Sequence, residues 1–174
     1  MSKNILIGIA LVLTLSCALT VALVQQLTDS DRVETIAHRI ADFDLPAGYQ
    51  TDYAVDVLDY TIAAYKSDDE QTHLVFVQGP SGIIPNESVI AGYIPNTSRH
   101  ADWHATTVLS TEQRTIRDQP ATLTISERTN GEGQRYRSAN LVFSGREGTA
   151  LLVFNQPVTQ WDDESVDTFI QSIH

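Results

Sequence analysis

Residues 121–154, ATLTISERTNGEGQRYRSANLVFSGREGTALLVF, decide the fold of this chain. Three runs rich in β-branched and aromatic residues lie at 121–128, 136–144 and 149–154. The turn residues between them are Asn130-Gly131-Glu132-Gly133 and Gly145-Arg146-Glu147-Gly148. Short strands at regular spacing, separated by such turns, are typical of an antiparallel meander. We therefore predict that this stretch forms successive antiparallel strands of one sheet.

Further strands are predicted on the N-terminal side of this stretch. The run THLVFV at 72–77 has strong strand-forming content, and residues 60–65 precede it across a polar, turn-like segment. We predict a hairpin from these two runs. The acidic residues Asp68-Asp69-Glu70 between them lack the spacing of a calcium-binding loop, so we interpret them as the hairpin tip. The other predicted strands are 53–58, 103–109 and 112–116.

Helical patterns flank the predicted sheet. Within 25–41, apolar residues recur at the i, i+3, i+4, i+7 spacing of a helix, with Ser30 or Asp31 as the expected cap. Near the end of the chain, an apolar stripe follows three acidic residues that suit a helix start. Its members are Val166, Phe169, Ile170 and Ile173. The expected fold class is α+β: an N-terminal transmembrane helix, then an antiparallel β-meander sheet packed with a short N-terminal helix and a C-terminal helix.

Residues 5–24, ILIGIALVLTLSCALTVALV, form an uncharged segment of transmembrane length. Lys3 precedes it and Asp29 and Asp31 follow, which favours a cytoplasmic N-terminus. We predict two regions: a membrane anchor at 1–24 and an extracytoplasmic domain at 25–174, held in the cell membrane by a single span. Cleavage of a signal peptide and lipidation at Cys17 are the alternatives.

The composition limits the partners of the domain. Of the chain's 22 acidic and 11 basic residues, only Lys3 lies before position 25, so the domain carries 22 acidic against 10 basic residues, net −12. Such a charge repels nucleic acid, and we expect no nucleic-acid partner. Small residues four apart in the anchor, Ala10, Thr14, Ala18 and Ala22, predict a helix-mediated homodimer. The domain has no cysteine and hence no disulfide or thiol chemistry.

The order of elements resembles the PsbP-like α+β fold of envelope domains. Three segments carry the resemblance: Leu45-Pro46-Ala47-Gly48-Tyr49, Arg117-Asp118-Gln119-Pro120-Ala121, and Ala150-Leu151-Leu152-Val153-Phe154 followed by the closing helix. The chain is also similar to the β-rich outer domains of bacterial single-pass membrane proteins of unknown function. The first resemblance implies binding to other proteins rather than catalysis, because relatives of that fold mostly act in this way. We therefore expect a protein partner in the envelope.

The best chemical cluster is Arg99-His100-Ala101-Asp102-Trp103-His104. On a strand, His100, Asp102 and His104 share one face and present two imidazoles and a carboxylate to a metal such as zinc. The alternative without a metal is that these residues form a polar loop leading into a strand. A metal-binding protein or metal-dependent enzyme is therefore one alternative function. No cofactor is expected otherwise.

A long segment at 79–101 is rich in apolar residues, which indicates either a cover for the sheet or the lid of a ligand groove. A small-ligand sensor is thus a second alternative. The function that the sequence favours is a membrane-anchored, extracytoplasmic interaction or assembly module without catalytic activity.

Overall fold

A computed structural model describes residue 25, residues 27–85 and residues 104–174, with the side chains of 104 and 105 excepted. The predicted anchor at 5–24, with Cys17, lies outside these residues. Within the part of the chain that is described, no helix is long and apolar enough to cross a membrane. The anchor, its alternatives and the helix-mediated homodimer therefore stay predictions.

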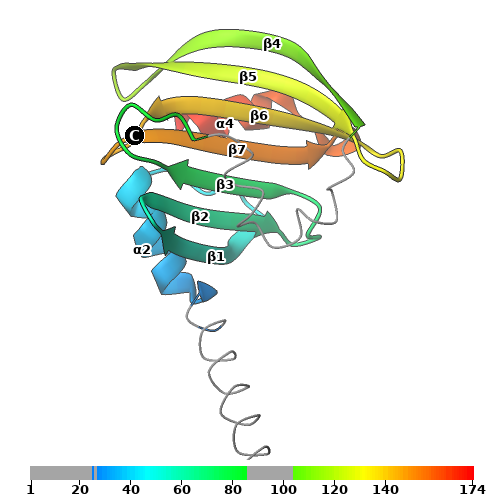
Figure 1. Cartoon of the computed structure of the whole chain (residues 1–174). Helices are drawn as coiled ribbons and strands as arrows, with labels where there is room; N and C mark the ends of the chain where they lie inside the picture. Colours follow the sequence, from blue (N-terminus) through cyan, green and yellow to red (C-terminus); the bar gives the residue numbers. More distant parts are fainter. Residues whose placement is uncertain (1–24, 26, 86–103) are drawn as a thin grey trace, which may run out of the picture.

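Seven strands form one antiparallel sheet, and two α-helices and a short 3-10 helix accompany it (Figure 1). The elements are α2 (Ser30–Ile40), β1 (Tyr49–Val57), β2 (Tyr60–Ser67), β3 (His73–Gln78), β4 (His104–Ile116), β5 (Gln119–Thr129), β6 (Arg135–Ser144), β7 (Thr149–Pro157), η2 (Val158–Gln160) and α4 (Asp163–Gln171). The predicted α+β class with helices at both ends of the domain is confirmed.

The strand order is β1-β2-β3-β7-β6-β5-β4. Two meanders, β1-β2-β3 and β4-β5-β6-β7, meet where β3 pairs with β7, so the expectation of one continuous meander was too simple. The predicted hairpin is confirmed as β2 and β3, with Tyr65 opposite Leu74. This order makes β1 and β4 the two edges of the sheet.

Both helices lie on the same face of the sheet, behind it in Figure 1. Val33 and Ile36 of α2 and Val166 and Phe169 of α4 belong to one buried cluster. Phe43, just after α2, stacks on Phe76 of β3 with ring centroids 4.4 Å apart. The apolar stripes that the sequence predicts on both helices therefore supply the main core. We call this side of the sheet the helix face.

The N-cap of α2 is Asp29, whose side chain accepts a hydrogen bond from the backbone N–H of Arg32 at 3.1 Å. The predicted cap, Ser30 or Asp31, is wrong: the helix already begins at Ser30, and its cap is the residue before it. Asp162 caps α4 in the same way by accepting from Ser165 N. Short acidic side chains at both caps satisfy backbone donors that a helix start leaves open.

Backbone hydrogen bonds join the segments that follow α2 and α4. Asp42 and His174 exchange two backbone hydrogen bonds, at 3.1 and 2.9 Å. The turn between β6 and β7 also packs here, since Arg146 N donates to Ile40 O at 3.0 Å. Gly148 lies so close to Gly79 O that an added Cβ would meet it at 2.2 Å. This turn requires glycine because of the close approach, not because of its φ angle.

Candidate interaction surface

The predicted metal ligands fall mostly outside the described chain. His100 and Asp102 lie outside it, and His104 begins β4 with a side chain that is not described. Among the described residues, no group of three or more His, Cys, Asp or Glu side chains is placed to hold a metal ion. The metal site therefore stays a prediction.

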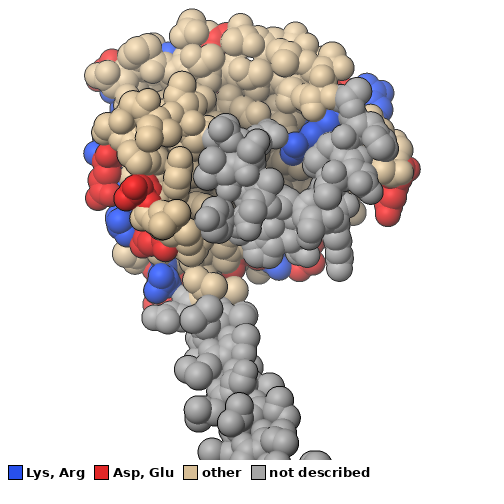
Figure 2. Space-filling model, viewed as in Figure 1, with Lys and Arg blue, Asp and Glu red and all other residues tan. Residues whose placement is uncertain are grey.

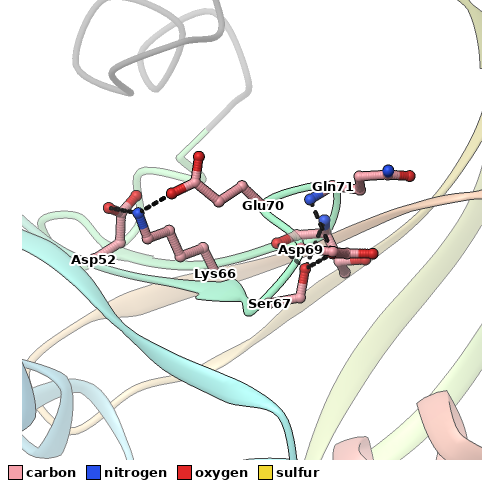
Figure 3. Close-up of polar contacts among 7 residues, drawn as sticks. Asp52, Lys66, Ser67, Asp69, Glu70 and Gln71 are labelled. Carbon is pink, nitrogen blue, oxygen red and sulfur yellow. Dashed lines mark hydrogen bonds and ion pairs between the residues drawn. The ribbon is translucent and has the colours of Figure 1, made fainter.

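A dense group of polar side chains lies at the β2–β3 hairpin (Figure 3). Lys66 Nζ lies 2.8 Å from Glu70 Oε1 and 3.8 Å from Asp52 Oδ1. The hydrogen bond to Glu70, together with the charge of Asp52, raises the pKa of Lys66 and keeps it protonated. The Lys66 ammonium group is therefore already paired with two carboxylates, which favours a structural role for Lys66.

The tip of the same hairpin is fixed by Ser67 and Asp69 (Figure 3). Ser67 Oγ donates to Asp69 Oδ1 at 2.5 Å, and Gln71 N donates to the same oxygen at 3.1 Å. Gln160 of η2 donates to Asp69 Oδ2 at 3.1 Å. The hydrogen bonds from Ser67 and Gln71 lower the pKa of Asp69. The acidic run is thus a hairpin tip, as predicted, and its contacts are those of a tight turn.

His73 at the start of β3 pairs in register with Lys66. Burial lowers the pKa of His73, with Asp52 opposing and Lys66 adding to the effect. A neutral imidazole follows at pH 7. The Ser67 hydroxyl donates to Asp69, and no hydrogen bond joins it to His73 among the described residues.

An open cleft of about 710 Å³ lies at the opposite end of β1 and β2. Its cation, Arg39, lies 3.0 Å from Asp56 Oδ2 and 3.8 Å from Glu147 Oε2. The cleft includes Gly79 and Pro80, the first residues of the predicted lid, whose residues from 86 to 101 lie outside the described chain. Because two carboxylates neutralise Arg39, the cleft does not present a free cation to an anionic ligand.

The sheet face opposite the helices has an unusual composition over β4, β5 and β6. On β5 and β6, Leu123 and Leu141 belong to the helix-face core, so alternate residues point the other way. Residues that lie directly opposite each other on paired strands point to the same face of the sheet. The β4 residues paired with outward-pointing β5 residues therefore point outward too. The row comprises Val108, Thr111, Gln113, Thr115, Pro120, Thr122, Thr124, Ser126, Arg128, Tyr136, Ser138, Asn140, Val142 and Ser144. We call these residues the outer face.

None of the residues of the outer face is acidic, and Arg128 is the one charged member. The same chain carries 22 acidic residues. Figure 2 shows this part of the surface, over β4 and β5, almost entirely without charged side chains, which gather at its margins and lower on the molecule. Charged side chains are depleted in the cores of protein interfaces because their desolvation is costly. Ser126, Tyr136 and Ser138 of this row are buried, whereas its β4 members Val108, Thr111, Gln113 and Thr115 are exposed. The exposed, acid-free part of the outer face therefore has the composition of a contact surface.

The edge strand β4 continues this surface. Val108 and Leu109 are 60% and 49% exposed and lie at a bulge, where Val108 pairs with Ser126 but Ser110 with Ile125. Residues 106–111, TTVLST, carry no charge. A bulge places an extra residue in one strand, here Leu109, and so leaves two neighbouring apolar side chains at the edge.

Sequence reasoning missed the outer face. Its signal was present in ATLTIS at 121–126, where Thr and Ser alternate with apolar residues. That alternation was used only to predict a strand. Recognising the surface needed the register, because the acid-free rows of β4, β5 and β6 become one surface only when they pair.

Comparisons with known proteins identify a fold and no family. No protein-family model matches the chain, and no curated protein matches it by sequence. The solution structure of cyanobacterial PsbP (CyanoP) from Synechocystis sp. PCC 6803 is similar, with a TM-score of 0.52 and 15% sequence identity over 79% of this chain and 87% of that one. The described domain has the PsbP-like α+β fold.

Proposed function

We propose that this protein is a membrane-anchored, extracytoplasmic interaction or assembly module, and that its outer face contacts another protein of the envelope. The observation that carries the proposal is the absence of acidic residues from the outer face of a chain with net charge −11. A surface free of acid in so acidic a chain lowers the cost of desolvation on contact.

Two further observations support a binding role. The domain has the PsbP-like fold, which suggests a domain that acts by binding rather than by catalysis. The polar groups at the β2–β3 hairpin are occupied by structural partners, as Lys66 and Asp69 illustrate. The predicted anchor would hold the domain beside partners in the same envelope.

Site-specific photo-crosslinking in cells tests the proposal. A photoreactive residue at Thr124, in the centre of the outer face, is compared with one at Thr168, an exposed position of α4 on the other side of the sheet. We expect a discrete protein adduct from position 124 that is absent from position 168. Equal, diffuse labelling at both positions would contradict a dedicated contact surface.

A charge variant gives a second readout. Thr124→Lys places a cation at the centre of the outer face, and Thr168→Lys is the matched control. We expect the adduct formed through a nearby photoreactive position, Thr122, to weaken at least about tenfold in Thr124→Lys only, since burying an unpaired charge is costly. Unchanged crosslinking in both variants would count against the outer face.

A further inference from the structure

Strand β4 exposes a row of backbone hydrogen-bonding groups. It is 13 residues long and lies at the end of the strand order, with β5 on one side. Along an antiparallel strand, alternate residues direct their N–H and C=O groups to opposite sides. Within residues 27–85 and 104–174, no strand pairs with the outward side of β4. Unpaired backbone N–H and C=O groups on an edge strand can bind an extended chain, because another strand offers matching groups at the same regular spacing.

The side chains along this edge suit strand addition. The stretch 106–111 is uncharged, with hydroxyl-bearing residues around the exposed Val108 and Leu109. Arg114, further along, lies 2.8 Å from Glu112 and 3.1 Å from Asp167 of α4, on the helix face. An added strand along 106–111 thus meets hydroxyl and apolar groups and leaves these ion pairs intact.

One geometric observation favours a short segment of another protein over a second copy of this chain. Figure 1 shows α2 beginning near β1, at the edge of the sheet opposite β4. Antiparallel pairing of two β4 strands requires a twofold axis perpendicular to the sheet. It would place the starts of the two α2 helices at opposite ends of the pair, which conflicts with the predicted anchoring of both chains in one membrane.

We infer that the β4 edge binds an extended, non-acidic segment of a partner protein, about six residues long, by adding it as an eighth strand beside 106–111. The inference rests on the proposed function, because the predicted anchor excludes the second copy. The net charge of −11 favours segments with flanking Lys or Arg.

A defined probe tests the edge itself. The stretch TTVLST is nearly self-complementary in antiparallel pairing, with hydroxyls opposite hydroxyls and Val opposite Leu. The probe is therefore a fluorescent peptide, Lys-Thr-Thr-Val-Leu-Ser-Thr-Lys, titrated against the whole chain in detergent micelles and followed by anisotropy. The control peptide has proline in place of its valine, which removes a backbone donor and disfavours pairing.

We expect saturable binding to the wild-type chain, and binding at least about tenfold weaker for the proline peptide. Val108→Asp should weaken binding to a similar extent. The matched control is Leu58→Asp, the same change at a 91% exposed leucine in the turn between β1 and β2. That variant should bind the peptide like the wild type.

Equal binding of the two peptides, or equal binding by Val108→Asp and wild type, would overturn the inference. A wild-type dimer in sedimentation that Val108→Asp dissociates would also overturn it, because a second copy would then occupy the edge. A crosslink at Thr124 without peptide binding would leave the proposed function standing and refute only the β4 edge as its site.

Discussion

The two edges of the sheet differ in how they are protected. Strand β1 is flanked by α2 and carries Asp52 and Asp56, which pair with Lys66 and Arg39. Charged side chains and a covering helix are common means of preventing edge-to-edge association. The first half of β4 has neither charge nor a described neighbour on its outward side. The β1 edge therefore has protecting contacts that the first half of β4 lacks among the described residues, and this difference underlies the proposal that β4 is the contact edge.

The largest expected effect comes from a cavity in the core of the helix face. Phe76→Ala removes a fully buried ring that stacks on Phe43 and lies 6.3 Å from the Phe169 ring. The cavity should lower the free energy of unfolding by about 3–5 kcal/mol, measured by urea denaturation. A loss below about 1 kcal/mol would show that the helix face does not hold the domain together.

A pair of glycine variants sharpens the comparison between turns. Gly148→Ala forces a Cβ against the Gly79 carbonyl and should cost about 3 kcal/mol. Gly133→Ala, between β5 and β6, has open space around its Cβ but a φ of +79°, and should cost about 1 kcal/mol. Thermal and urea unfolding measure both. The reverse ranking would mean that the β6–β7 turn does not pack as tightly as described.

An acid titration tests how much Asp42, in the segment after α2, contributes to the stability of the domain. The hydrogen bond with His38, assisted by the charge of Arg146, holds the pKa of Asp42 below its ordinary value of 3.8. A depressed pKa contributes stability that is present above the ordinary pKa and lost as pH falls through the folded one. Asp42→Asn should therefore flatten the loss of stability below about pH 4. An unchanged slope in urea unfolding against pH would refute this contribution.

The smallest expected effect concerns the stability of the open edge. Val108→Asp should change the free energy of unfolding by less than about 0.5 kcal/mol, because the side chain is 60% exposed and at the sheet edge. Its consequence lies in binding instead. A loss of several kcal/mol in urea denaturation would mean that Val108 is part of the core and not of a free surface.

Much of the fold could be predicted from sequence. The Val33–Ile40 stripe and the runs at 72–77, 136–144 and 149–154 have unambiguous periodicity and became α2, β3, β6 and β7. Strand β4 was predicted as two runs because the bulge at Leu109 interrupts its alternation. The first strand begins at Tyr49, four residues earlier than predicted, where the Gly48 turn ends.

Strand order and the candidate site could not be predicted. The contact between β3 and β7 joins residues about 80 positions apart, and no local pattern records it. The outer face depends on that order, since Thr111, Thr124 and Asn140 come from three strands. The metal prediction at His100, Asp102 and His104 rests on residues that are not described, so it stays a prediction.

Hydrogen exchange of the whole chain, with and without the TTVLST peptide, tests the contrast between the edges most directly. We predict that the peptide slows exchange in fragments covering β4 and leaves those covering β1 unchanged, because the uncharged stretch 106–111 of β4 has no described neighbour on its outward side, whereas β1 carries paired acidic residues and contacts α2. Slower exchange in β1, or no change in either strand, would contradict the assignment of β4 as the contact edge.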